Sequence, residues 1–130
     1  MFQNVVNILT KKNDCDIFKR KYSLRERKEM FERISHRFPE RIPLIIERLD
    51  LKVPEIDRCR FLIPPCLTIG NLAYIIRKRI KLSPEQALFL LVDLVIPPAS
   101  ETIGNVYAKC KNDDGFLYVN YTTENTFGSL

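Results

Sequence analysis

Cysteine and histidine are the side chains best suited to metal binding or covalent catalysis, and this sequence has few of them. The four cysteines are Cys15, Cys59, Cys66 and Cys110, and His36 is the single histidine. The cysteines form no C-x-x-C pair and have no histidine partner at zinc-like spacing. The sequence also lacks a G-x-S-x-G elbow and a glycine-rich phosphate loop. We therefore predict free thiols in a reducing compartment, with no metal ion, no cofactor and no enzymatic activity.

The C-terminal tail, residues 122–130, carries a different candidate for chemistry. It reads T-T-E-N-T-F-G-S-L and has no apolar period to bind it to a folded body, so we expect it to project and be flexible. Gly128 lies near its end, and a residue without a Cβ fits a narrow enzyme channel. Such ends are common, so the meaning of this glycine depends on the body that carries it.

Size and charge limit the classes of function. The 130 residues, 45% of them hydrophobic and 28% charged, suit one folded domain. Lysine and arginine number 21 against 16 acidic residues, and this charge of +5 suits nucleic acid, anionic lipid or acidic peptide equally. Nucleic acid is not expected, because no aromatic platform accompanies the charge. No apolar run reaches the ~20 residues of a membrane span and no signal peptide is evident, so we expect a cytoplasmic protein.

A basic amphipathic helix over 68–82 is the element that would organise the body. Apolar residues recur at spacings of three and four from Ile69 to Ile80, and Thr68 is a suitable N-cap. Lysines and arginines crowd the last turn, where they meet the negative end of the helix dipole. Such a helix needs a sheet to cover.

Further elements surround this helix. The capping box Ser23-Leu24-Arg25-Glu26 predicts a helix that ends before Pro39, with an apolar face and a solvated face that includes Arg27. Strands are expected over 42–46, 59–63, 87–92 and 116–121, with a short helix over 102–107. Pro43 places the first strand near an edge, the first two strands should be antiparallel, and the continuous apolar third strand should be central.

This order of elements predicts an α+β fold, a ubiquitin-like β-grasp with a four-stranded mixed sheet, a central helix and an N-terminal helical extension. Residues 1–21 form the extension, in which apolar residues from Phe2 to Leu9 could make a short amphipathic helix that packs on the domain or touches a membrane. Residues 22–121 form the ubiquitin-like domain with its leading helix, and 122–130 the tail.

Several separate motifs, in one order, make the chain resemble the GABARAP-type autophagy modifiers, a ubiquitin-like family conjugated to phosphatidylethanolamine. The motifs are F-P-E-R-I-P, F-L-I-P, I-R-K-R-I, V-I-P-P and the terminal T-F-G. The likeness covers about residues 22–130. A β-grasp body with a projecting terminal glycine is the architecture of protein modifiers, so the resemblance gives the tail a meaning.

The resemblance implies a conjugation pathway. Members of this family are cut by a cysteine protease after the terminal glycine, activated as thioesters on ubiquitin-style enzymes, and joined to phosphatidylethanolamine. The matching bond here is Gly128–Ser129, preceded by Phe127. Only a free Gly128 carboxylate can be adenylated and passed through a thiol to a lipid amine. The lipid would then hold the chain on the autophagosome membrane, where it recruits receptors and cargo.

The resemblance also implies a groove for aromatic-x-x-aliphatic peptides of autophagy receptors, which would bind as an added strand. By match to the family, the aromatic pocket consists of Ile34, Pro43, Arg60, Leu62 and Phe116. The aliphatic pocket consists of Phe38, Arg41, Phe61, Ile63, Pro64, Leu67, Leu72 and Ile75. Arg41 and Arg60 would meet acidic residues beside the peptide core. Phe61 and Leu62 point to opposite faces of one strand, so one can be buried while the other lines the groove.

Two alternatives stay open. Met30 stands where relatives often carry an acidic residue, so the preference for flanking charge can differ. The basic helix that begins after Ser23 would also suit tubulin, and an unconjugated β-grasp adaptor that binds peptides or tubulin is the alternative function.

Overall fold

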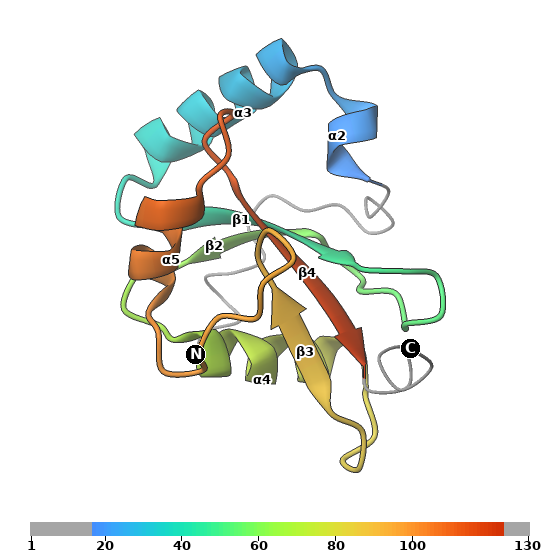
Figure 1. The fold of residues 1–130 in the computed structure, drawn as a ribbon. Helices are drawn as coiled ribbons and strands as arrows, with labels where there is room; N and C mark the ends of the chain where they lie inside the picture. Colours follow the sequence, from blue (N-terminus) through green and yellow to red (C-terminus); the bar gives the residue numbers. More distant parts are fainter. Residues whose placement is uncertain (1–16, 124–130) are drawn as a thin grey trace.

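A four-stranded mixed sheet carries the helices on its two faces in the computed structural model, which describes residues 17–123 (Figure 1). The strands are β1 Ile42–Arg48, β2 Arg60–Ile63, β3 Leu88–Leu91 and β4 Leu117–Thr123. Their order is β2-β1-β4-β3, with β1 antiparallel to β2, parallel to β4, and β3 antiparallel to β4. The predicted fold class, a ubiquitin-like mixed sheet with an N-terminal helical region, is confirmed.

Side-chain caps define where the helices begin. The helices are α2 Phe18–Lys21, α3 Leu24–Arg37, α4 Ile69–Arg79 and α5 Ile103–Cys110. At the start of α3 the Ser23 hydroxyl accepts from the Glu26 amide at 3.2 Å, and the Glu26 carboxylate accepts from the Ser23 amide at 2.9 Å. Thr68 and Asn71 form the same reciprocal pair at the start of α4. Both predicted helix starts are therefore confirmed.

The two faces of the sheet carry separate cores. α4 packs on one face, where it joins alternate residues of the strands, including Leu44 and Phe61. α2 and α3 lie on the other face, where Ile34 joins Ile45 and Leu62 (Figure 1). Phe61 and Leu62 thus point to opposite faces, as the strand period predicts.

The predicted edge position of the first strand is wrong, because β1 is interior. Pro43 is tolerated there for a reason of register. The Ile46 amide donates to the carbonyl of Cys59, the residue before β2, so the odd-numbered positions of β1 turn their nitrogens toward β4. Pairing with β4 begins only at Leu44, so the missing amide of Pro43 removes no bond of either ladder.

The predicted central position of the third strand is also wrong, because β3 lies at the edge and β4 lies between β3 and β1. Leu90 and Leu91 point to opposite faces and are both buried, although β3 has one partner strand in the sheet. A continuous apolar run therefore reports burial of both faces and does not report how many neighbouring strands there are.

Two further predictions concern segments outside the described residues. The amphipathic run of the N-terminal extension lies before residue 17, and of that extension only Ile17 to Lys21, with α2, is described. Of the predicted tail, Thr122 and Thr123 are buried in β4, so its predicted start at residue 122 is too early, and Phe127 and Gly128 lie beyond residue 123.

Candidate functional site

β2 is an edge strand of the described sheet, and its outer side offers backbone groups for an added strand. The Ile46–Cys59 hydrogen bond, 2.7 Å long, fixes which positions of β2 bond to β1. By alternation, the amide and carbonyl of Leu62 point away from β1, at the edge of the sheet. An extended peptide could therefore pair with β2 there, between the faces covered by α3 and α4.

A cavity of about 330 Å³ opens beside this edge on the α3 face. Its lining residues are Met30, Arg33, Ile34, Arg37 and Arg60. Ile34 and Leu62 pack together with Phe116 beneath it, and Pro43 lies opposite Leu62 in register. The structure thus brings together the five residues of the predicted aromatic pocket, although Leu62 and Phe116 are buried and Arg60 supplies more of the accessible surface.

The cavity is cationic around an apolar floor. Arg33, Arg37 and Arg60 line it, and among residues 17–123 the lining includes no carboxylate. Arg33 and Arg37 were not among the predicted pocket residues, although they follow Met30 by three and seven positions and residues at these spacings share one helical face. The charge favours a ligand that presents an acidic group beside an apolar side chain.

The predicted aliphatic pocket is divided by the sheet. Five of its members, Phe61, Ile63, Leu67, Leu72 and Ile75, are buried in the core on the α4 face. Phe38 packs instead with the cluster on the α3 face, and Arg41 and Pro64 are half-buried. Leu72 is fully buried and can only support a wall, whereas Leu67 and Ile75 keep a small exposed fraction.

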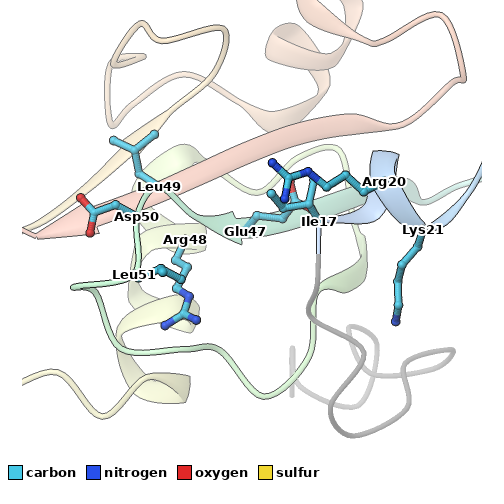
Figure 2. Close-up of a pocket in the computed structure, with 8 residues that line it drawn as sticks. All are labelled: Ile17, Arg20, Lys21, Glu47, Arg48, Leu49, Asp50 and Leu51. Carbon is cyan, nitrogen blue, oxygen red and sulfur yellow. The ribbon is translucent and has the colours of Figure 1, made fainter.

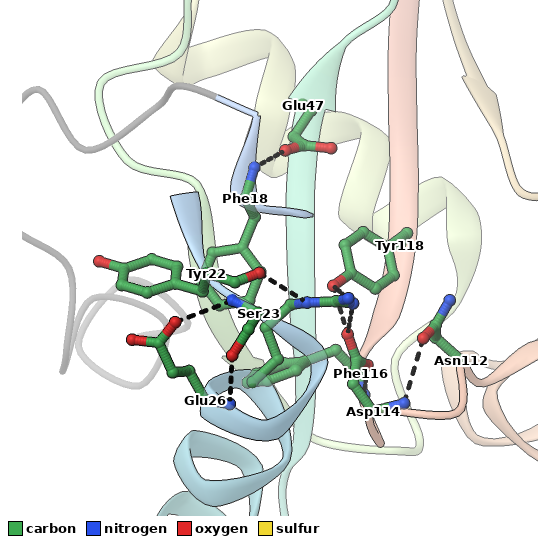
Figure 3. A network of polar contacts seen from close by, with 10 residues as sticks. Phe18, Tyr22, Ser23, Glu26, Glu47, Asn112, Asp114, Phe116 and Tyr118 are labelled. Carbon is green, nitrogen blue, oxygen red and sulfur yellow. Dashed lines mark hydrogen bonds and ion pairs between the residues drawn. The ribbon is translucent and has the colours of Figure 1, made fainter. Parts of the chain in front are cut away.

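A polar network ties α3 to β4 (Figure 3). Arg27 Nη1 lies 2.7 Å from Asp114 Oδ2, and Tyr118 donates its hydroxyl to the same carboxylate. The Phe116 amide donates to Asp114 Oδ1 at 2.8 Å. Burial, and next the bond to Asp114, raise the pKa of the Tyr118 hydroxyl far above its usual value, so it stays a donor. This network fixes the helix that forms one wall of the cationic cavity.

The network overturns the prediction that Arg27 lies on the solvated face of its helix. The Arg27 side chain is only 12% exposed and that of Asp114 is 0% exposed. Arg27 precedes Phe31 by one helical turn and Ile34 by two, so it belongs to the inward stripe. An inward arginine is stable there because a buried carboxylate neutralises it.

α2 is held against the same face by Phe18. Its amide donates to Glu47 Oε2 at 2.8 Å (Figure 3), and its ring packs edge-on against Phe116 at 5.4 Å. Burial raises the pKa of the Glu47 carboxyl, although the Phe18 amide and the charge of Lys19 oppose the shift.

A second cavity, of about 580 Å³, lies between α2 and the end of β1 (Figure 2). Its lining residues are Ile17, Arg20, Lys21, Glu47, Arg48, Leu49, Asp50 and Leu51. Some of its charged groups stabilise the local loop, since Arg48 donates to the Val53 carbonyl and Asp50 accepts from the Lys52 amide. No sequence prediction pointed to this cavity, and it does not include the β2 edge.

Within residues 17–123, Cys59, Cys66 and Cys110 are free thiols. The same part of the chain brings together no group of three or more metal-ligating side chains. None of its helices combines the length and the apolar character that crossing a bilayer requires.

Comparison with known proteins places these features in a family context. Residues 26–128 match the family model described as "Autophagy protein Atg8 ubiquitin like". The chain is 47% identical to Autophagy-related protein 8 of Mycosarcoma maydis over 114 residues, which is 87% of this chain and 97% of the relative. It is 47% identical to Autophagy-related protein 8e of Arabidopsis thaliana over 118 residues, 90% of this chain and 97% of the relative. The crystal structure of Trypanosoma brucei ATG8 superposes with a TM-score of 0.78 at 34% identity, covering 84% of this chain and 95% of the other.

Proposed function

The chain belongs to the Atg8 family of ubiquitin-like autophagy proteins, and we propose that it is cleaved after Gly128 and conjugated there to phosphatidylethanolamine. The family match supports this proposal because it ends at Gly128, leaving Ser129 and Leu130 beyond it. β4 ends at Thr123, so four residues, 124–127, separate the body from that glycine. This spacer can span about 17 Å, which is long enough to enter a narrow enzyme channel.

The chemistry requires that the last two residues be removed. Peptide-bonded Gly128 has no free carboxylate, whereas the cleaved chain has one that ATP can adenylate. A cysteine of an activating enzyme then displaces AMP to form a thioester, and the lipid amine finally displaces the thiol to form an amide. The chain supplies the acyl group and no catalytic residue, so we propose that it is a substrate of processing and transfer enzymes rather than an enzyme itself.

Receptor binding is the second half of the proposal. We propose that aromatic-x-x-aliphatic peptides add a strand to β2 and place their aromatic side chain in the cavity lined by Met30, Ile34 and Arg60. The observation that carries this proposal is an edge strand beside a cavity that two apolar residues and three arginines line. Once lipidated, the protein would move from the cytoplasm to the autophagosome membrane and hold receptors there.

Intact-mass analysis tests the processing step. The full chain treated with the family's processing protease should lose the mass of Ser129 and Leu130 and nothing more. A Gly128→Ala variant should resist cleavage, and a relative with an established site serves as the positive control for the protease. Cleavage at another bond, or an unchanged mass while the control is cut, would refute the assignment of Gly128.

Calorimetry with an acidic aromatic-x-x-aliphatic peptide tests the groove. Arg60→Glu should weaken binding by about tenfold or more, because it replaces a cation on the cavity rim by an anion. Leu62→Ala should weaken binding as well. Arg25→Glu makes the same charge change on the outer face of α3, where the side chain is 89% exposed, and should have little effect. Unchanged affinity in both Arg60→Glu and Leu62→Ala would place the groove elsewhere.

A further inference from the structure

A rigid apolar turn projects beyond the end of β3. Val92 and Val95 exchange backbone hydrogen bonds of 2.8 and 3.0 Å. Asp93 and Leu94 between them have φ angles of 52° and 63°. Two central residues with positive φ define a type I′ turn, a tight connection with little freedom. Leu94, Val95 and Ile96, which we call the apolar tip, are 76%, 65% and 52% exposed.

The apolar tip is unfavourable for the isolated domain in two ways. Glycine or asparagine is preferred at the second position of a type I′ turn, whereas leucine is strained there because its Cβ crowds the backbone. Three consecutive exposed aliphatic residues also leave apolar surface in water. Strain and exposure at the same residue, Leu94, indicate that the side chain serves an interaction outside the fold.

The shape and charge of this region favour a bilayer as the partner. The cavity at the base of the turn is about 180 Å³, which is below the usual volume of a ligand pocket. The turn is therefore better suited to contact a surface than to enclose a small-molecule ligand. The nearby Glu101 and Lys109 neutralise each other at 2.9 Å. Asp93 in the turn itself is exposed and is the one carboxylate next to the tip in the sequence. The tip therefore offers three apolar side chains beside one negative charge, so apolar contact rather than attraction to anionic lipid would drive its binding at the acyl boundary of a membrane.

The position of the tip fits a chain tethered through its C-terminus, so this inference rests on the proposed lipidation. Leu88 of β3 lies opposite Thr123 of β4, and Leu94 is six residues further along. Because the chain turns at Val92–Val95, these six residue steps measure at most about 20 Å, and the five residue steps from Thr123 to Gly128 can span about 17 Å. A lipid on Gly128 and the apolar tip can therefore touch one membrane when β3 lies along its surface.

That orientation would also leave the receptor groove accessible. β3 and β2 are the opposite edges of the sheet, separated by β4 and β1. Three strand spacings amount to about 14 Å. If the β3 edge faced the membrane, the β2 edge would face the cytosol.

We propose that the apolar tip, Leu94-Val95-Ile96, inserts into the bilayer to which the chain is tethered and orients the receptor groove away from it. Lipidation and the tip would then act together, the lipid supplying attachment and the tip supplying orientation. Insertion is driven by apolar transfer, so it should depend weakly on salt and should not require anionic lipid.

Tryptophan fluorescence tests the proposal directly, because the sequence contains no tryptophan. Val95→Trp places a single probe on the tip without changing a residue of positive φ. Leu51→Trp is the matched control, since Leu51 is 82% exposed and lies in the loop after β1. Each full chain is held on neutral phosphatidylcholine vesicles through a C-terminal histidine tag and a nickel-chelating lipid, which needs no conjugating enzyme.

The tethered Val95→Trp chain should show a blue-shifted emission that brominated acyl chains quench, and the tethered Leu51→Trp chain should show neither effect. Adding Leu94→Asn to Val95→Trp should weaken insertion by about tenfold, because a leucine side chain loses most of its transfer free energy. Water-like emission of Val95→Trp, or equal quenching of both probes, would overturn the proposal.

A stability measurement separates this role from a structural one. Leu94→Asn should leave the midpoint of thermal unfolding unchanged or raise it, since asparagine tolerates positive φ and the leucine buries little surface. A lowered midpoint would show that the leucine stabilises the fold and would count against the proposal. Because the tether is chemical, failure of insertion leaves the Gly128 assignment intact, and failure of enzymatic conjugation leaves the insertion result readable.

Discussion

The two faces of the sheet are stabilised by different means. The α4 face is a continuous apolar core in which Leu72 and Ile76 are fully buried against alternate strand residues. The α3 face has a smaller apolar cluster and adds a buried ion pair, Arg27–Asp114, and a hydrogen bond from the Phe18 amide to the Glu47 carboxylate. The cationic cavity lies on this second face.

The difference shows how a small domain can keep a binding surface without losing its fold. Apolar area supplies stability without direction, so the α4 face can be filled completely. A face that must leave a cavity open cannot use all of its area, and directional polar contacts hold its helices at fixed positions instead. Substitutions on the α4 face should therefore mainly lower stability, and substitutions of cavity-lining residues on the α3 face should mainly weaken peptide binding.

The largest loss of stability is expected in the α4 core. Leu72→Ala should lower the free energy of unfolding by about 4 kcal/mol, because a cavity would open in a site that cannot collapse. Ile34→Ala on the α3 face should cost about 2 kcal/mol, since it borders an existing cavity, yet it should weaken receptor-peptide binding more. Denaturant titration and calorimetry on both variants measure the contrast. A larger stability loss in Ile34→Ala would contradict the division between the faces.

Breaking the ion pair is the next largest effect. Arg27→Met should lower the free energy of unfolding by about 3 kcal/mol, because it leaves the Asp114 carboxylate buried without its cation. Arg25→Met is the matched control: its partner Glu29 is exposed, and the loss should stay below about 1 kcal/mol. Asp114→Asn added to Arg27→Met should recover part of the loss. Equal losses for the two arginine substitutions in denaturant titration would contradict the claim that the buried Arg27–Asp114 ion pair holds α3 in place.

A close contact between α3 and the turn before β4 gives a smaller effect. Gly115 has a φ of 99°, and a Cβ built there would lie 2.4 Å from the Phe31 ring. Gly115→Ala should therefore cost about 2 kcal/mol from strain and overpacking together. Phe31→Leu in the same chain should restore part of that loss by relieving the overlap. No recovery in thermal unfolding would mean that the backbone conformation alone limits this position.

The smallest expected effect concerns pH. The folded-state pKa of Glu47 is raised by burial, so its contribution to stability is fully present below the unfolded pKa of about 4.5 and is lost as pH rises through the folded value. Glu47→Gln should remove this dependence while its amide oxygen still accepts from Phe18. As pH rises from 4 to 7, the free energy of unfolding of the variant should therefore increase relative to that of the native chain. If the free energy of unfolding of the variant instead fell relative to that of the native chain, the pKa of Glu47 would be lowered by folding and not raised.

The sequence predicted helix starts and family membership more completely than it predicted which strands pair and which distant side chains meet. Capping boxes at Ser23 and Thr68 are decided within four residues, so both were readable. The positions of β1 and β3 were misjudged because strand order depends on long-range pairing, which apolar runs do not encode. The order of predicted strands and helices led to a fold class that the structure confirms. Arg27 was misjudged because its partner, Asp114, is distant in the sequence.

The site residues show the same limit. Ile34, Arg60 and Leu62 were named from motifs, and the structure brings them to one end of the α3 face. Arg33 and Arg37 were missed: their spacing from Met30 placed them on its helical face, but only the structure shows that a cavity borders that face. The division of the aliphatic set between two faces could not be foreseen without knowing which side of the sheet Phe38 covers.

The central claim is that Gly128 is the point of lipid attachment, and reconstituted conjugation tests it most directly. The cleaved chain is incubated with ATP, the activating and transfer enzymes of the family, and vesicles that contain phosphatidylethanolamine, and the products are analysed by intact mass. The native chain should gain the mass of one phosphatidylethanolamine less water, and a Gly128→Ala chain should gain none. An unmodified native chain beside a conjugated control relative, or an alanine variant conjugated at the native rate, would contradict the account.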